Sequence, residues 1–74
     1  MAEANWTRLK ESDIKEYGGM LPARVVLEHN QADHSYRTFL ETITKSGETG
    51  FQYGLYFYRE DEALADFNQR LGRL

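Results

Sequence analysis

Two segments with a regular hydrophobic pattern stand at the C-terminal end of the chain, one directly after the other. In the stretch 51–58 every second residue is apolar or aromatic, which is the period of a β-strand with one buried face. From residue 60 onward apolar residues recur every three or four positions, which predicts an amphipathic helix packed on that strand. The two apolar stripes are Phe51, Tyr53, Leu55 and Phe57 on the strand, and Leu64, Phe67, Leu71 and Leu74 on the helix.

Two further strands are predicted upstream of the aromatic strand. The run 23–29 follows the only proline, and the β-favouring run 35–45 follows a polar turn at 30–33. A second turn at 46–50 contains two glycines and leads into the aromatic strand. Three consecutive strands joined by short turns predict an antiparallel meander.

The N-terminal region has weaker patterns. We expect residues 1–4 to be a flexible end and residues 5–9 to form a short strand or an extended arm. Ser12 is a typical N-cap for a short helix over 13–17, and the glycines at 18–19 are a typical stop. The sequence therefore predicts one α+β domain over residues 1–74. It has a short N-terminal helix with an optional strand before it, a three-stranded antiparallel meander, and a C-terminal helix packed on one sheet face.

Charge suggests the register of the first hairpin. A four-residue loop at 31–34 brings charged residues of opposite sign together across the two strands. Such cross-strand pairs favour a register by about 0.2–1 kcal/mol each. The facing pairs are then Glu28 with Arg37, Val26 with Phe39, and Arg24 with Glu41.

The same reasoning extends to the second hairpin. A four-residue loop at 46–49 places Thr38 opposite Phe57, Leu40 opposite Leu55 and Phe39 opposite Tyr56. The face that the helix covers is then expected to contain Val25, Leu27, Leu40, Phe51, Tyr53, Leu55 and Phe57.

The sheet face opposite the helix is more apolar than a solvated face requires. Gly54 leaves a gap in it, as room for a partner group or as relief of crowding beside Glu41. Two alternatives could cover this face: the N-terminal segment, folding back with Trp6, Leu9 and Ile14, or another protein chain. The interaction surface that we predict has Val26, Phe39, Tyr56 and Tyr58 as apolar anchors, with Arg24, Arg37 and Glu41 at the rim.

Composition narrows the classes of function. The 74 residues are 41% hydrophobic and include no cysteine, which predicts a packed domain without disulfides or thiolate zinc sites. With a formal charge of −3, the protein lacks the positive electrostatic field that is typical of nucleic-acid binders. The apolar runs are too short for a membrane span, and the first residues have no signal-peptide pattern. We expect a cytoplasmic protein, of bacterial origin, that makes no contact with a membrane.

The sequence offers little catalytic or metal-binding chemistry. His29 and His34 are near Glu28 and Asp33, but this spacing matches no known ligand pattern. Ser35 next to His34 is no catalytic pair, because adjacent strand residues point to opposite sides. We therefore predict that the protein is not an enzyme and binds no metal, cofactor or small-molecule substrate.

The predicted terminal helix begins with acidic residues and ends with Arg70 and Arg73, a distribution that complements the helix dipole. Its acidic end also forms a surface that could engage a basic protein or imitate phosphates. This acidic patch consists of Glu60, Asp61, Glu62 and Asp66.

We predict a small non-enzymatic protein-interaction module that binds itself as a homodimer, or a protein partner, through the open sheet face. The alternative is an acidic regulator or inhibitor of a nucleic-acid-handling complex, of the kind that mobile elements encode. Direct nucleic-acid binding through Arg24, Arg37 and Arg59 is a third possibility, and the acidic balance of the chain disfavours it.

Overall fold

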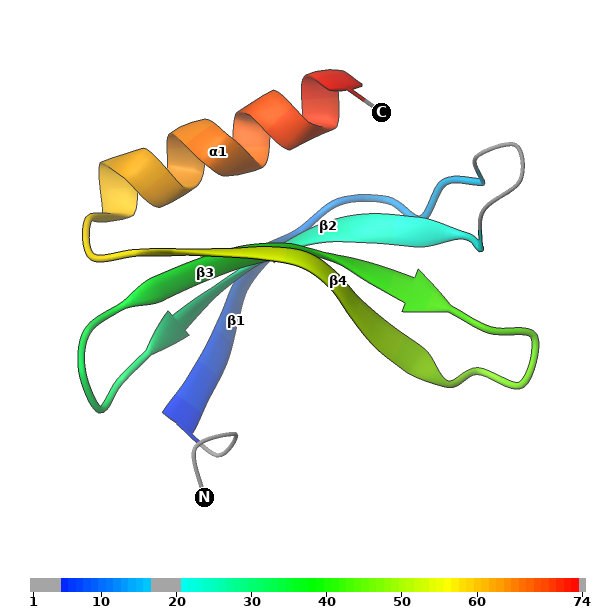
Figure 1. Cartoon of the computed structure of the whole chain (residues 1–74), viewed down its shortest axis with the longest axis horizontal. Coiled ribbons are helices and arrows are strands. Elements are labelled where there is room, and N and C mark those ends of the chain that lie inside the picture. The colour runs from blue at the N-terminus through cyan, green and yellow to red at the C-terminus, as the bar shows by residue number, and fades with distance from the viewer. Residues whose placement is uncertain (1–4, 17–20, 74) are drawn as a thin grey trace.

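The computed structural model describes residues 5–16 and 21–73. Four strands form one antiparallel sheet in the order β1-β2-β3-β4, and helix α1 lies across one of its faces (Figure 1). The elements are β1 (Trp6–Glu11), β2 (Ala23–Asn30), β3 (Tyr36–Ile43), β4 (Thr49–Phe57) and α1 (Glu60–Arg73). Strands β1 and β4 are the two edges of this sheet, so each has one side without a neighbouring strand among the described residues.

The short N-terminal helix predicted over 13–17 is wrong for the residues that the structure describes. The Ser12 hydroxyl, expected to cap it, instead accepts the backbone N–H of Val25 at 2.8 Å. Lys15 exchanges two backbone hydrogen bonds with Ala23, so this segment lies alongside β2 in an extended conformation. A helix this short satisfies few of its own backbone groups, whereas pairing with β2 satisfies several. Tyr17 and the glycines at 18–19 lie outside the described residues.

The sheet has four strands, whereas a three-stranded meander was predicted, with a further strand at 5–9 only as an option. The optional strand at 5–9 exists as β1, which is longer than expected and pairs with β2 from Trp6↔Asn30 to Glu11↔Val26. Its register shifts at Leu9, between Arg8 and Lys10, which marks a bulge. The architecture remains α+β, with a four-stranded meander and a single described helix.

The predicted register of the first hairpin is confirmed. Strand β2 pairs with β3 so that Arg24 faces Glu41, Val26 faces Phe39 and Glu28 faces Arg37. The two charged pairs close as salt bridges of 2.7 Å each. Alternating side chains and a short polar turn were enough to specify this pairing.

The predicted register of the second hairpin is wrong. Thr38 pairs with Leu55 and not with Phe57, while Leu40 pairs with Gln52. Between these two pairs, one residue of β3, Phe39, lies opposite two residues of β4, Tyr53 and Gly54, which is a bulge in β4. Tyr53 lies in the bulge with a φ of 56°, in the left-handed region that non-glycine residues rarely adopt.

This bulge moves Phe51 to the sheet face opposite α1, because one extra residue inverts the alternation of side chains. Its ring stacks on Phe39, with ring centroids 4.3 Å apart. Gly54 provides the space, since a Cβ there would stand 2.4 Å from the Phe51 ring. The gap at Gly54 is therefore occupied by the same strand. The expectation that Phe51, Tyr53, Leu55 and Phe57 form one core stripe is wrong.

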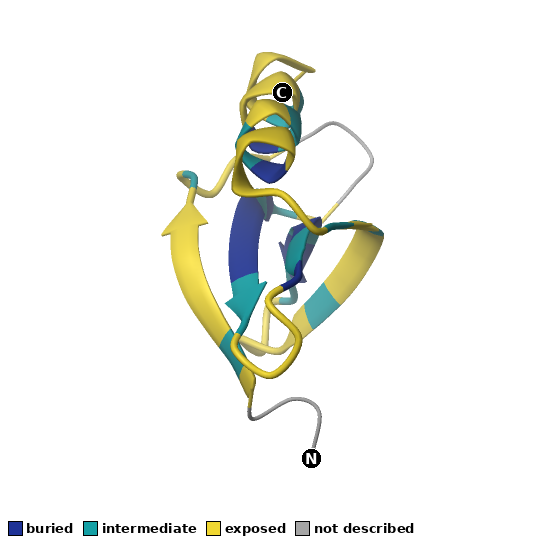
Figure 2. Ribbon diagram, turned by 90° about the vertical axis from the view of Figure 1, so that its left-hand side faces the viewer, coloured by how far each residue is buried: buried dark blue, intermediate teal, exposed yellow. Residues whose placement is uncertain are grey.

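The core under α1 is small. Val25 and Leu27 of β2 pack against Ala63 and Phe67 of α1, and all four are almost fully buried. Figure 2 shows the buried positions gathered on the central strands and on the helix above them, with exposed positions along the edges. The residues packed around this cluster are Tyr36, Leu40, Phe57 and Leu64. Of the predicted helix stripe, Phe67 is central, Leu71 is 36% exposed, and Leu74 lies outside the described residues.

No helix of the described chain is both long and apolar enough to cross a membrane.

Candidate functional site

The face opposite α1, called the free face below, holds most of the interaction residues predicted from sequence. Val26 is fully buried and Phe39 is 4% exposed, so neither can serve as an accessible anchor in this structure. Phe51 covers Phe39 from β4, and the Arg37 guanidinium lies 4.0 Å from the centroid of the Trp6 ring. The free face is therefore a second small core.

Trp6 reaches the free face because the sheet curls. The Trp6 ring on β1 is 6.2 Å from the Tyr56 ring on β4, although these are opposite edges of the sheet. Three strand spacings of a flat sheet would separate them by roughly 14 Å. Of the N-terminal residues expected to fold over this face, Trp6 does so, whereas Leu9 and Ile14 stay about half exposed.

A network of ion pairs forms the polar part of the free face. Arg8 donates to Glu41 at 2.8 Å and to Glu28 at 3.4 Å, and Arg24 donates to the other Glu41 oxygen at 2.7 Å. Hydrogen bonds from Arg8, reinforced by Arg24, hold the pKa of Glu41 below its usual range despite its burial. Arg24, Arg37 and Glu41, predicted as rim residues, thus hold the sheet together instead of lying open.

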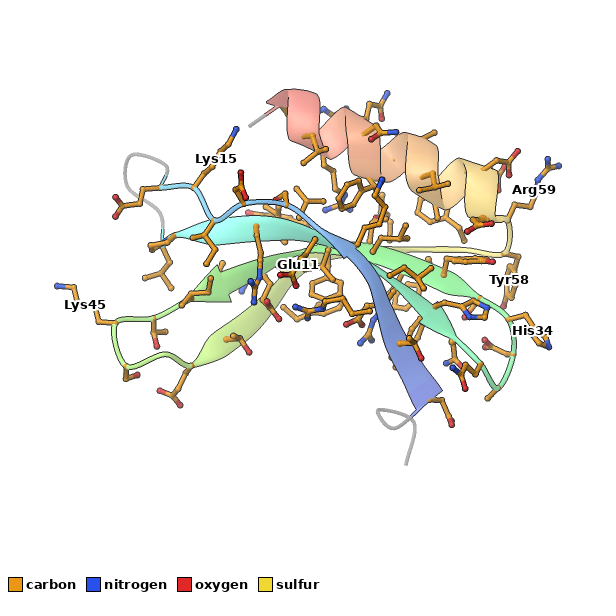
Figure 3. The ribbon with its side chains drawn as sticks, turned by 180° about the vertical axis from the view of Figure 1, so that it is seen from behind. Glu11, Lys15, His34, Lys45, Tyr58 and Arg59 are labelled. Atoms are coloured by element: carbon orange, nitrogen blue, oxygen red, sulfur yellow. The ribbon has the colours of Figure 1, made fainter. Side chains whose placement is uncertain are left out.

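The accessible part of the predicted surface is on β4 and just after it. Tyr56 is 59% exposed, and Tyr58 is 78% exposed in the bend that leads into α1. Figure 3 shows Tyr58 beside Arg59 at one end of the sheet, opposite the end where Lys45 lies. The structure therefore separates the predicted set into buried or partly buried members on β2 and β3 and exposed members on or just after β4.

Strand β4 has an unusual combination of properties for an edge strand. None of its nine residues is charged, and Phe51, Tyr53, Leu55 and Tyr56 are between 44% and 70% exposed. The opposite edge, β1, carries Arg8, Lys10 and Glu11 in addition to its bulge. Charged side chains on an edge discourage pairing with another chain, and β4 lacks them.

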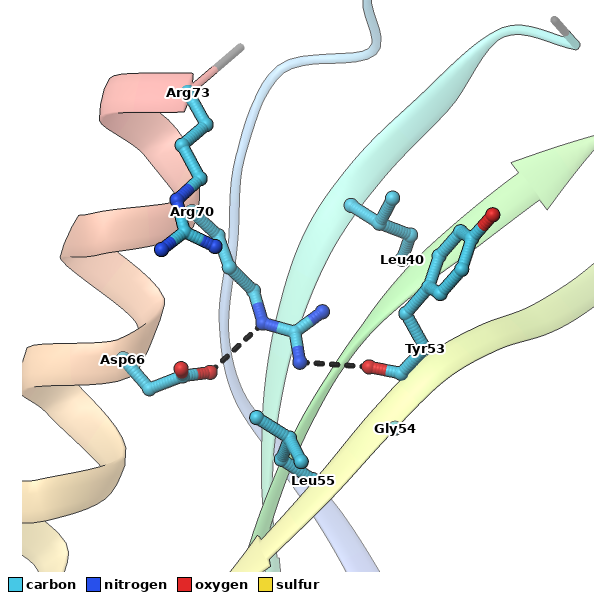
Figure 4. A pocket seen from close by; sticks show the side chains of 7 residues that line it. All are labelled: Leu40, Tyr53, Gly54, Leu55, Asp66, Arg70 and Arg73. Carbon is cyan, nitrogen blue, oxygen red and sulfur yellow. Dashed lines mark hydrogen bonds and ion pairs between the residues drawn. The ribbon is translucent and has the colours of Figure 1, made fainter.

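A hollow of about 460 Å³ opens between β4 and the C-terminal half of α1 (Figure 4). Leu40, Tyr53 and Leu55 form its apolar wall, while Arg70 and Arg73 project from the helix. Its volume is within the range of roughly 300–1,000 Å³ typical of binding pockets. Because it lies along the β4 edge, side chains of a chain docked on β4 could enter it.

Three side chains fix the helix beside this hollow. The Thr38 hydroxyl donates to Asp66, the Arg70 Nε donates to Asp66 at 2.7 Å, and the Arg70 Nη2 donates to the Tyr53 carbonyl at 2.6 Å. Burial alone would raise the pKa of Asp66, but the hydrogen bonds from Thr38 and Arg70 outweigh it and lower that pKa. Arg70 thus connects the helix to the backbone of β4 at the bulge.

The predicted acidic patch is divided by this arrangement. Asp66 points toward the sheet and is bound to Thr38 and Arg70. Asp61 is exposed and paired with Arg59 at 2.8 Å. Only Glu60 and Glu62 remain as exposed acids of the first turn without such a salt bridge among the described residues.

The histidines stay at the end of the first hairpin. The rings of His29 and His34 are 6.1 Å apart, while Glu28 is engaged with arginines and Asp33 accepts hydrogen bonds from Ser35. Among the described residues no group of three His, Asp or Glu side chains is arranged to hold a metal ion.

Sequence reasoning assigned Tyr53 and Leu55 to the core and gave Arg70 and Arg73 only a helix-dipole role. The structure brings all four to the β4 edge. The signal that could have indicated this edge is the absence of charge from the nine residues of β4, next to charged strands on the other side of the sheet.

Comparison with protein-family models, with curated proteins and with solved structures found no match for this chain.

Proposed function

We propose that this protein is a small interaction module that binds a protein chain along the β4 edge. The observation that carries the proposal is the uncharged nine-residue edge strand with its four exposed apolar or aromatic side chains. Exposed apolar surface of this kind marks protein contact sites, and a free edge strand can add a further strand. The hollow beside α1 supports this by offering space for side chains of the added chain.

The proposal revises where the interaction surface lies. It keeps Tyr56 and Tyr58 from the predicted set, and it replaces the buried Val26 and Phe39 with Tyr53 and Leu55. No observation favours the acidic regulator over this module, because Asp66 is turned toward the sheet and Asp61 is paired with Arg59. We also propose a cytoplasmic location, which the cysteine-free composition supports.

The direct test is photo-crosslinking in cells from position 53. Replacing Tyr53 with the photoreactive residue benzoyl-phenylalanine preserves an aromatic ring at a site that is 70% exposed. We expect a discrete covalent adduct from this position after irradiation. Lys45, exposed in the turn between β3 and β4, is the matched control and should give none. Equal yields from the two positions, or no adduct from position 53, would contradict the proposal.

Tyr53 allows binding and stability to be separated. A non-glycine residue in the left-handed region carries strain of order 1 kcal/mol, and the exposed ring of Tyr53 contributes little packing. Tyr53→Gly is therefore expected to leave the free energy of unfolding unchanged or raise it by up to about 1 kcal/mol, while weakening association. Urea unfolding and the yield of adduct formed from a benzoyl-phenylalanine at position 56 in the same variant measure the two effects.

Leu55→Gly is the control for Tyr53→Gly. Leu55 has no positive φ, so glycine there relieves no strain and adds backbone entropy to the unfolded chain. We expect Leu55→Gly to lower stability by about 1 kcal/mol. A larger loss for Tyr53→Gly than for Leu55→Gly would show that Tyr53 is held for the fold and not for binding.

A further inference from the structure

Helix α1 presents a row of side chains along the β4 edge that changes sign from one end to the other. Glu62 and Ala65 line a hollow beside Phe57, and Arg70 and Arg73 line the larger hollow beside Tyr53. The side chains of Glu62 and Arg73 make no hydrogen bond or salt bridge with the rest of the described chain. The edge therefore has an acid without a salt bridge at one end and a base without a salt bridge at the other, among the described residues.

Such an arrangement is complementary to itself. Helix α1 follows β4 after a short bend and runs back along the sheet, so its acidic end lies near Phe57. Its basic end, with Arg70 and Arg73, lies near Tyr53 (Figure 4). If two copies are related by a two-fold axis at the β4 edge, the acidic end of each helix lies beside the basic end of the helix in the other copy. Each contact in a two-fold interface occurs twice, so two ion pairs would form.

We propose that the chain bound at the β4 edge is a second copy of this protein. Residues 54–56 of the two copies pair antiparallel about a two-fold axis at Leu55, and Glu62 of each copy faces Arg73 of the other. This inference rests on the proposed function and names the partner. The absence of charge from β4 fits such pairing. When a strand pairs with its own copy, a charged residue near the axis would face the same charge on the other copy and repel it.

The position of the axis follows from the bulge. The bulge and the Arg70 hydrogen bond to the Tyr53 carbonyl divide β4 into two regularly paired parts, 49–52 and 55–57, and the second part is the one beside both hollows of α1. Leu55, half exposed, then meets Leu55 of the second copy, and Tyr53 of each copy lies opposite Phe57 of the other. Aromatic pairs across strands favour such a register. The eight strands of the two copies would form one continuous sheet with both helices on the same face.

Charge reversal tests this inference through the mass in solution, measured by light scattering over a concentration series. We expect the wild type to be a dimer that dissociates on dilution. Glu62→Arg alone and Arg73→Glu alone should each weaken association by about tenfold or more, because two attractive pairs become repulsive. The double variant Glu62→Arg/Arg73→Glu should return to within about threefold of the wild type, because both pairs reform with exchanged signs.

Glu60→Arg is the matched control for this series. Glu60 is an exposed acid of the same helix turn but lines neither hollow, so its reversal should change association by less than about twofold. Circular dichroism of each variant shows that the fold is kept. A wild type that is monomeric at every concentration, or a double variant that remains as weak as the single ones, overturns the inference.

A second test uses the absence of cysteine from the chain. Leu55→Cys places one thiol from each copy at the axis, where paired Cα atoms are close enough for a disulfide. Thr49→Cys, on the same exposed strand, would stand roughly 40 Å from its counterpart in the dimer, since twelve residue steps of about 3.3 Å separate them. Under mild oxidation with glutathione we expect at least about tenfold faster covalent dimerisation of Leu55→Cys. Equal rates for the two variants contradict the inference.

The results separate this inference from the proposed function. Photo-adducts from position 53 at twice the mass of the chain support both. Adducts of other masses, together with a monomeric wild type in solution, would overturn the second copy as partner and leave β4 as an interaction edge. No adduct from position 53 would overturn the proposed function itself.

Discussion

Phe67→Ala is expected to remove about 3–5 kcal/mol from the free energy of unfolding, the range typical for truncating a buried aromatic side chain. Phe67 is 3% exposed, and the other buried residue of α1 is the much smaller Ala63. The contact of the helix with Val25 and Leu27 therefore depends mainly on one ring. A domain of this length has a total stability of about 4–11 kcal/mol, so the variant should lose between about a quarter and all of its stability at 25 °C.

Urea unfolding followed by circular dichroism measures this loss, with Leu71→Ala as the control on the same helix. Leu71 is 36% exposed, so its truncation should cost about 1 kcal/mol or less. If Phe67→Ala proved no more destabilising than Leu71→Ala, α1 would not pack on β2 as described. The fold of the four strands would then have to be stabilised by the free face.

Glu41→Gln is expected to cost about 2–3 kcal/mol at neutral pH. Glu41 is 8% exposed and accepts hydrogen bonds from Arg8 and Arg24, so the neutral amide removes the carboxylate that these two guanidinium groups share. Arg8 keeps its pairs with Glu11 and Glu28, and Arg24 keeps its pair with Glu11. The loss should fall below the 3–5 kcal/mol typical of a fully buried pair, because the Arg8 and Arg24 side chains are 32% and 23% exposed. Urea unfolding at pH 7 measures it.

The same variant should also differ from the wild type in how its folding stability changes at acidic pH. The hydrogen bond from Arg8 is the main cause that lowers the pKa of Glu41 in the folded protein below its ordinary value of 4.5. The stabilisation is thus present above the unfolded-state pKa and is lost as the pH falls through the folded-state pKa. Between pH 5 and pH 3 we expect the wild type to lose more stability than Glu41→Gln. Asp66 also has a lowered pKa, so the variant keeps part of the acid sensitivity.

Glu48→Gln provides the comparison for both effects, because Glu48 is exposed in the turn between β3 and β4. It should change stability at pH 7 by less than about 0.5 kcal/mol, and its acid response should match the wild type. An identical acid response in Glu41→Gln and the wild type would mean that the ion network of the free face does not stabilise the folded state.

Part of the candidate site could be predicted from the sequence and part could not. The aromatic run 51–58 was predicted to be a strand with one face buried under a helix, and Tyr56 and Tyr58 were predicted as anchors of the interaction surface on the other face. Tyr53 and Leu55 were assigned to the core because strict alternation was assumed through the whole strand. Their exposure follows from the position of β4 at the edge, where α1 covers the central strands more fully.

The sequence by itself determined the elements whose signals are local. The β2–β3 register follows from alternating residues and two opposite charge pairs around a short turn, and α1 follows from its apolar period and its charged ends. Both depend on residues close in the chain. The interactions that form this hairpin and this helix can therefore be made before distant segments of the chain come into contact.

Only the tertiary structure decided the N-terminal strand and the bulge in β4. The cap signal at Ser12 was outweighed when its hydroxyl and backbone bonded to Val25, thirteen residues away. The bulge inverted Phe51 because stacking on Phe39 and the space at Gly54 became available only in the folded sheet. A one-residue shift leaves the sequence pattern unchanged but moves side chains to the other face, and long-range packing selects between the two.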